Sequence, residues 1–200
     1  DTATALVGLD SAADAVALLG QLKDRLNDRI ESFELIPAEL FALVAKHVPD
    51  AGLSFGIDCP WYVLTEIATG GSVDAVEQAL LEEAERGHIR DALLAKNAGE
   101  AAAFWRVRHS IPEAEKKEGS ALKHDIAVPL SRMAEFLARG SALLDELRPD
   151  HALIAFGHVG DGNLHYNVVL PGELTPEEWQ SEGERITGAL YELVDELGGS

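Results

Sequence analysis

Two histidines and an asparagine surround a glycine-rich turn near the end of the chain, in the stretch FGHVGDGNLHYN. Asp161-Gly162 is typical of a two-residue type I′ hairpin turn, because both positions of that turn need a positive φ. Such a turn pairs His158 with His165 and brings Asn167 to the same face of the hairpin. Paired positions have Cβ atoms about 4.5–5.5 Å apart, so the spacing predicts two imidazoles that can bind one metal ion.

Three interpretations of this hairpin stay open. The histidines either bind a metal ion or only donate hydrogen bonds at the rim of a sheet. A catalytic zinc ion has three protein ligands and an open position, so a metal site needs a third ligand, typically a carboxylate. An unrelated metallohydrolase would need that ligand and a general base from within this chain, and Asp161 is already committed to the turn.

The composition limits the kinds of partner. Acidic residues outnumber basic ones by 35 to 16, and the net charge of -19 argues against binding to nucleic acid or to an anionic membrane surface. No apolar run approaches the roughly 18 residues of a membrane span. The single cysteine, Cys59, excludes an intrachain disulfide and is expected to be inert. We expect a cytoplasmic protein, or a mitochondrial-matrix protein if the source is eukaryotic, which could form a homo-oligomer.

Apolar periodicity predicts the elements that must position these residues. Strands are expected at Thr2–Leu9, Ile30–Ile36, Trp61–Ala68, Ile89–Ala95, Ala121–Val128, Ala152–His158 and Leu164–Leu170. Helices are expected at Ala12–Leu26 with Ser11 as its cap, Pro37–Val48, Val73–Arg86, Gly99–Glu115 with a break at Pro112, Ser131–Leu147 and Pro176–Leu197. Because the two halves have a similar strand–helix order, we expect one α+β domain over residues 1–200, with ferredoxin-like halves and a largely antiparallel sheet covered by helices.

Four stretches resemble the C-terminal domain of FAD-linked oxidases of the vanillyl-alcohol-oxidase type. His-Val-Gly-Asp-Gly-Asn-Leu-His is similar to the hallmark of that domain in the D-2-hydroxyacid dehydrogenase group. That group includes D-lactate dehydrogenase, D-2-hydroxyglutarate dehydrogenase and the glycolate oxidase flavin subunit. SFELIPAEL, FWRVRHSIPEA and LKHDIAVPLSRM resemble three further stretches of the same domain, so the resemblance covers nearly the whole chain.

The resemblance implies a substrate-binding cap that works with FAD held by a separate N-terminal domain. We therefore expect a piece excised from a longer chain, inactive without its FAD domain. In the family, the sequence after Gly198-Gly199-Ser200 continues to a glutamate that is the third metal ligand. That ligand is then expected beyond Ser200, and the metal is expected to be a divalent ion such as zinc.

The resemblance also gives roles to individual residues. His158 and His165 match the catalytic, metal-binding histidines, whereas Arg108, Lys123 and Asn167 match residues that hold the substrate. From the sequence pattern alone, Arg108 is typical of a solvated helix face, and Lys123 with Asp125 of a wet sheet face. Family members selective for D-2-hydroxyglutarate have a threonine in place of Pro112 in this chain, which weakens the case for that substrate.

Two functions therefore remain for the parent protein. The first is oxidation of a small D-2-hydroxy acid to the 2-oxo acid by hydride transfer to FAD. Arg108 would bind the substrate carboxylate through a bidentate fork and Lys123 through a point charge. The alternative is a non-catalytic module that binds metal or small acids, or that assembles subunits.

Overall fold

One antiparallel sheet forms the centre of the computed structural model, which describes residues 1–52 and 55–200. Within these residues the strand order is β4-β1-β3-β2-β7-β8-β5, and β6 also pairs with β8. The strands are β1 Thr2–Leu9, β2 Ile30–Pro37, β3 Trp61–Ala68, β4 Asp91–Leu94, β5 Ala121–Leu122, β6 Asp125–Ala127, β7 Ala152–His158 and β8 Asn163–Val169. The helices are α1 Ala12–Leu26, α2 Ala38–His47, α3 Asp74–Glu85, α4 Ala98–Glu118, α5 Met133–Leu147 and α6 Pro176–Glu196. Short 3₁₀ turns lie at Pro49–Ala51, Leu130–Arg132 and Val159–Asp161.

The sheet consists of two halves, as the sequence predicts. The first half has the ferredoxin-like order β4-β1-β3-β2, with α1 and α3 as its two crossovers. In the second half, β7, β8 and the short strands β5 and β6 follow the same arrangement around α5. The halves join where β2 pairs antiparallel with β7, at Glu34 opposite His158 and Leu35 opposite Gly157. The predicted α+β fold is therefore confirmed.

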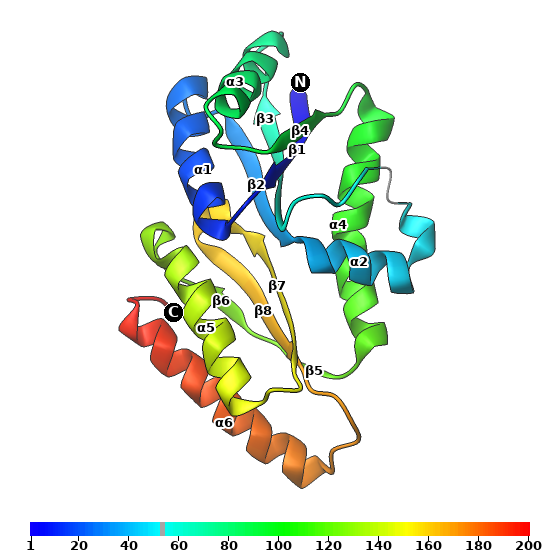
Figure 1. Ribbon diagram of the computed structural model, residues 1–200, viewed down its shortest axis with the longest axis vertical. Coiled ribbons are helices and arrows are strands. Elements are labelled where there is room, and N and C mark those ends of the chain that lie inside the picture. The colour runs from blue at the N-terminus through cyan, green and yellow to red at the C-terminus, as the bar shows by residue number, and fades with distance from the viewer. Residues whose placement is uncertain (53–54) are drawn as a thin grey trace.

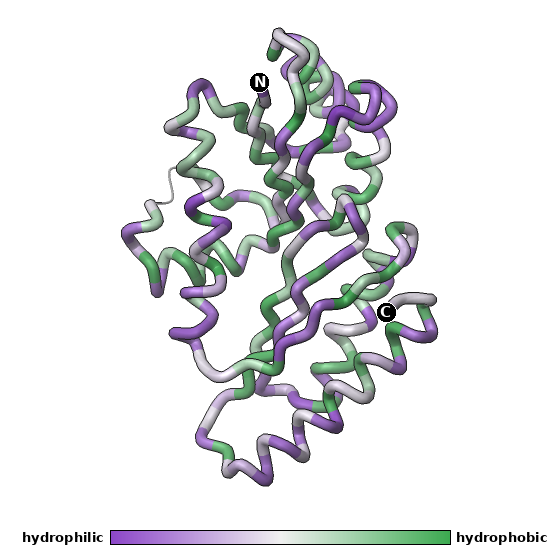
Figure 2. Tube along the Cα trace, turned by 180° about the vertical axis from the view of Figure 1, so that it is seen from behind, coloured by the Kyte–Doolittle hydropathy of each residue, from purple (hydrophilic) through white to green (hydrophobic). Residues whose placement is uncertain are grey.

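Helices cover the two faces of the sheet unequally (Figure 1). Helices α1, α3, α5 and α6 pack on one face and share a core that extends along both halves. Helices α2 and α4 pack on the other face, over a second core that centres on the first half. Along β8, hydrophilic and hydrophobic positions alternate (Figure 2). Leu164, Tyr166 and Val168 belong to the core under α5 and α6. His165 and Asn167 therefore point to the α4 side, where Ile154 and Phe156 of β7 also pack.

Local sequence signals explain most of the element ends. Ser11 accepts a hydrogen bond from the Asp14 amide and begins α1 as predicted. The predicted strand Ala121–Val128 is instead divided into β5 and β6, and the predicted strand Ile89–Ala95 is shorter. The predicted break at Pro112 is wrong, because α4 continues through it to Glu118. Proline removes one backbone hydrogen bond, but fully buried neighbours in α4 hold this part of the helix against the second core.

Gly140 in α5 provides a test of the packing between α5 and the sheet. A Cβ at this position would lie 2.6 Å from Oη and 3.2 Å from Cζ of Tyr166, whose side chain is fully buried. We expect Gly140→Ala to lower the free energy of unfolding by about 1–3 kcal/mol because the ring must shift. Urea unfolding followed by circular dichroism measures this change.

Gly20 in α1 is the matched control. It is exposed in a helix interior, and a Cβ there would have no heavy atom within 4 Å. Gly20→Ala should raise the free energy of unfolding by about 0.5–1 kcal/mol, because alanine favours the helix. Equal effects of the two substitutions would contradict the packing described for Gly140.

Candidate functional site

The histidine hairpin differs from the predicted one in its turn and its register. A 3₁₀ turn at Val159–Asp161 connects β7 to β8, and Phe156, not His158, lies opposite His165. The predicted type I′ turn is therefore wrong. The displacement is two residues, however, and a shift of two keeps every side chain on its face of the sheet. His158 and His165 still lie together, with their ring centroids 6.0 Å apart.

Two glycines of the hairpin are required by its backbone. Gly157 has a φ of +145°, and a Cβ there would lie 3.2 Å from the backbone nitrogen of His165. Gly162 has a φ of +76°, and a Cβ there would lie 2.6 Å from the carbonyl oxygen of Val128. Side chains other than glycine are disfavoured at such φ values. The glycine density of the sequence thus reflects a close approach of backbones around the histidines.

Each histidine of the pair contacts a carboxylate through Nδ1. His158 Nδ1 lies 2.5 Å from Oε1 of Glu34, and His165 Nδ1 lies 2.6 Å from Oδ1 of Asp125. The contact of His165 is a hydrogen bond, which holds a proton on Nδ1 and leaves the Nε2 lone pair available. Metal-binding histidines commonly have this second partner, which fixes their tautomer and orientation. His165 is therefore prepared to bind a cation or to accept a proton through Nε2, and His158 lies next to it with its Nδ1 turned to Glu34.

Arg108 is buried, and the same carboxylate that contacts His158 holds it. Arg108 Nε and Nη2 each lie 3.0 Å from Oε2 of Glu34, and the guanidinium carbon lies 4.7 Å from the centroid of the Phe156 ring. Arg108 is 8% exposed and Glu34 only 2%, so the expectation of a solvated arginine from pattern alone is wrong. Glu34 uses the Nε and Nη2 edge of the guanidinium, and Nη1 has no hydrogen bond to the residues that the structure describes.

A second buried carboxylate, Glu115, holds the other two predicted substrate residues. Asn167 Nδ2 donates to Oε2 of Glu115 at 2.9 Å, and Asn167 Oδ1 accepts from the His124 amide at 3.3 Å. Lys123 Nζ lies 2.9 Å from Oε1 of Glu115. This contact is an ion pair without hydrogen-bond alignment, because Oε1 has no hydrogen-bond partner among the described residues. The side chain of Lys123 is 57% exposed and can also contact a ligand.

The structure thus brings all five predicted site residues to the α4 side of the sheet and adds three carboxylates. Sequence reasoning did not identify Glu34 or Glu115 and treated Asp125 as part of a wet face. Glu34 had a usable signal, because it is a single acid within the apolar strand sequence FELI. Glu115 lies in the polar stretch EAEKKE, where nothing separates it from solvated neighbours.

The predicted metal site is incomplete in the part of the chain that the structure describes. No group of three His, Cys, Asp or Glu side chains able to hold a metal ion occurs there. The two imidazoles fit as nitrogen ligands, and their carboxylate partners suit that role. Two imidazoles are one ligand fewer than the three protein ligands that a catalytic zinc ion usually has.

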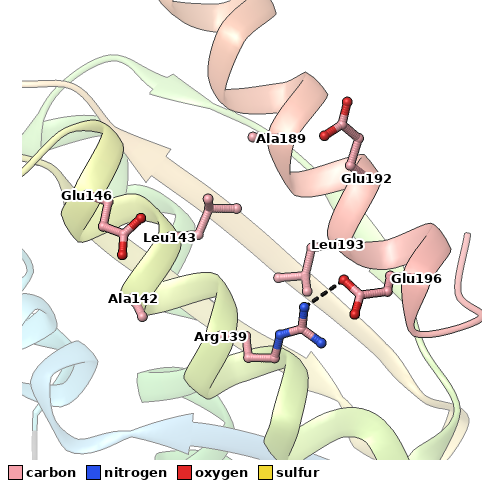
Figure 3. A pocket seen from close by; sticks show the side chains of 8 residues that line it. All are labelled: Arg139, Ala142, Leu143, Glu146, Ala189, Glu192, Leu193 and Glu196. Atoms are coloured by element: carbon pink, nitrogen blue, oxygen red, sulfur yellow. Dashed lines mark hydrogen bonds and ion pairs between the residues drawn. The ribbon is translucent and has the colours of Figure 1, made fainter.

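Other features lie away from this face. A groove of about 470 Å³ between α5 and α6 has acidic side chains and an ion pair from Arg139 to Glu196 (Figure 3). It lies on the outer side of the helices that cover the opposite face of the sheet. Burial raises the pKa of the Cys59 thiol, which agrees with the expectation that this cysteine is inert. No helix in the described residues has the length and hydropathy needed to cross a membrane.

The chain is similar to known proteins in its sequence and in its fold. The profile of a family described as FAD linked oxidases, C-terminal domain, matches residues 1–200. D-2-hydroxyglutarate dehydrogenase of Xanthomonas citri pv. viticola is 33% identical over 174 residues, which cover 86% of this chain and 36% of that protein. The mitochondrial D-2-hydroxyglutarate dehydrogenase of Arabidopsis thaliana is 30% identical over 190 residues, which cover 88% of this chain and 33% of that protein.

A solved structure has the same fold. The crystal structure of p-cresol methylhydroxylase with substrate bound matches with a TM-score of 0.69 at 13% identity. The match covers 100% of this chain and 44% of that one. The chain therefore spans between a third and a half of the length of these proteins.

Glu34 provides a test of the buried ion pairs. We expect Glu34→Gln to lower the free energy of unfolding by about 3 kcal/mol, because it leaves the Arg108 guanidinium buried without a counter-charge. Glu135→Gln is the control, since Glu135 pairs with two arginines at the surface. Glu135→Gln should lower the free energy of unfolding much less, because water solvates exposed charges. Urea unfolding compares the two, and equal losses would show that Glu34 does not hold a buried charge.

Proposed function

The chain belongs to the FAD-linked oxidases as their C-terminal domain, and on this premise we propose that it binds the substrate of a flavin-dependent D-2-hydroxyacid dehydrogenase. The parent protein would oxidise a small D-2-hydroxy acid to the 2-oxo acid. One observation carries the proposal: two carboxylate-paired histidines share a sheet face with Arg108 and Lys123. That arrangement combines cations for a carboxylate with imidazoles for a hydroxyl group.

The cations and the amide would bind and orient the acid. The free side of the Arg108 fork suits a substrate carboxylate, because guanidinium and carboxylate can form two parallel hydrogen bonds. Lys123 is exposed on the same side of the sheet, next to Glu115, and adds a mobile positive charge. Asn167 is fixed by Glu115 and the His124 amide, so a bound acid meets a side chain that is already ordered.

The histidines would act on the 2-hydroxyl group. A bound flavin supplies the acceptor for the hydride that leaves the α-carbon. A divalent metal ion held by His158 and His165 would add positive charge beside the hydroxyl and favour loss of its proton. Its third ligand would come from outside the described residues. A histidine whose Nε2 is not bound to metal could instead accept that proton, because its Nδ1 proton stays on the carboxylate side.

The alternative function is a module that binds metal or small acids without catalysis, or that assembles subunits. The buried pairs Glu34–Arg108 and Glu115–Asn167 would then serve the stability of the sheet alone. Homo-oligomerisation and a cytoplasmic or mitochondrial-matrix location stay predictions.

Anaerobic reduction of the flavin tests the proposal in the full-length protein. Addition of a D-2-hydroxy acid should bleach the flavin absorbance, whereas the L-enantiomer should not. His158→Ala should slow the bleaching by at least about 100-fold, the range expected when a proton-transfer group is lost. If a metal contributes, a chelator should have a comparable effect on the unmodified protein.

The control is His151→Ala, because His151 forms a local hydrogen bond with the Arg148 carbonyl oxygen, at the end of β7 that is opposite to His158. The flavin of His151→Ala should be reduced at the same rate as the flavin of the unmodified protein. A flavin that stays oxidised with D-2-hydroxy acids of every size, in protein shown to contain FAD, would favour the non-catalytic alternative.

A further inference from the structure

The charges of the site are nearly balanced before any substrate binds. Its two cations, Arg108 and Lys123, face three carboxylates at Glu34, Glu115 and Asp125. Glu34 and Glu115 are each 2% exposed, so solvent screens them poorly. Each cation is therefore already paired with a carboxylate that cannot turn away into water. Such a site attracts a second substrate carboxylate only weakly.

Glu115 affects this balance most directly at Lys123. The two charged groups lie 2.9 Å apart, and Lys123 is the exposed member of the pair. A carboxylate that binds to Lys123 from the solvent side also approaches the negative charge of Glu115. At the effective dielectric constant of a protein surface, about 20, charges of like sign at such short range repel appreciably. The repulsion reduces the binding of any ligand group that is anionic at this position.

The stripe of α4 that leads from Arg108 to Glu115 carries no further cation. Arg108, Pro112 and Glu115 have the spacing i, i+4 and i+7, which places them along one stripe of α4. Arg108 is held by Glu34, and Pro112 has neither a hydroxyl group nor a backbone N–H. Along this stripe, Arg108 can bind one carboxylate of the substrate. Glu115, two turns further along the helix, would repel a second one.

We propose that Glu115 determines specificity, making the site select 2-hydroxy monocarboxylic acids over 2-hydroxy dicarboxylic acids. The inference rests on the proposed function, because it assigns a substrate class to the same site. The expected substrate class differs from the dicarboxylic acid, hydroxyglutarate, in the names of two relatives. The selection acts through charge, so a substrate that has a neutral group of equal size in place of the second carboxylate should bind without this repulsion.

Two substrates of equal size test the role of charge in the full-length, flavin-containing protein. D-2-hydroxyglutarate carries a second carboxylate, whereas its 5-amide, D-2-hydroxyglutaramate, is a monocarboxylate of the same shape. We expect kcat/KM for the amide to exceed that for the diacid by about tenfold or more. In Glu115→Gln this ratio should fall by about tenfold, mainly through a lower KM for the diacid.

Glu113→Gln is the matched control. Glu113 lies on the same helix and is 58% exposed, and it pairs only with Lys117, at 2.8 Å. In Glu113→Gln, the ratio of kcat/KM for the amide to kcat/KM for the diacid should equal that of the unmodified protein. The comparison in the unmodified protein needs no substitution, so it stands even if Glu115→Gln does not fold.

A preference of the unmodified protein for the diacid would overturn the inference while leaving the dehydrogenase proposal intact. A folded Glu115→Gln protein with an unchanged ratio would overturn it as well. If neither of the two substrates nor any other 2-hydroxy acid reduces the flavin, the proposed function is refuted, and the inference with it.

Discussion

The burial of Glu34 is the interaction on which the site depends. A carboxylate inside a sheet is stable only when charge and hydrogen bonds compensate it. Glu34 obtains a counter-charge and a hydrogen bond from Arg108, which comes from α4, and it also contacts His158, which ends β7. One buried charge therefore fixes a helix to the sheet, orders a guanidinium and orients an imidazole. Glu115 repeats the same principle for Asn167 and Lys123, so the polar side chains that face a ligand are ordered before it arrives.

The unequal cover of the sheet explains why the side chains of Lys123, His158 and His165 are accessible. Four helices seal one face along both halves, whereas α2 and α4 seal the other face mainly over the first half (Figure 1). The polar positions of β6, β7 and β8 point to the α4 side, where the side chains of Asp125, His158 and His165 are 75%, 51% and 36% exposed. A sheet face with so many charged and imidazole groups suits contact with an ionic ligand better than contact with an apolar core. The solved relative with the same fold shows that this architecture occurs in an enzyme more than twice as long.

Apolar periodicity was sufficient to place most elements, because the sheet and helices alternate buried and exposed positions regularly. Thr2–Leu9, Ala12–Leu26 and Trp61–Ala68 match the structure to the residue. The hairpin register was wrong, because Asp-Gly fits more than one turn and the unusual backbone at Gly157 leaves no local pattern. The side-chain faces survived that error, because strand side chains have a period of two. The carboxylate partners were missed because Glu34 and Arg108 are 74 residues apart, and only tertiary packing brings them into contact.

The short junction between β2 and β7 links ligand binding to the contact between the two halves of the sheet. The halves of the sheet pair there at Glu34 and Leu35 only, and the flanking site residues belong to both sides of this line. Any molecule that contacts Arg108 and the histidines at once bridges the two halves. By mass action, a molecule that binds only the joined arrangement stabilises it by an amount that grows with its concentration relative to its Kd. Binding at the site and pairing of β2 with β7 are therefore thermodynamically linked, and a ligand bound across this junction strengthens the contact between the two halves.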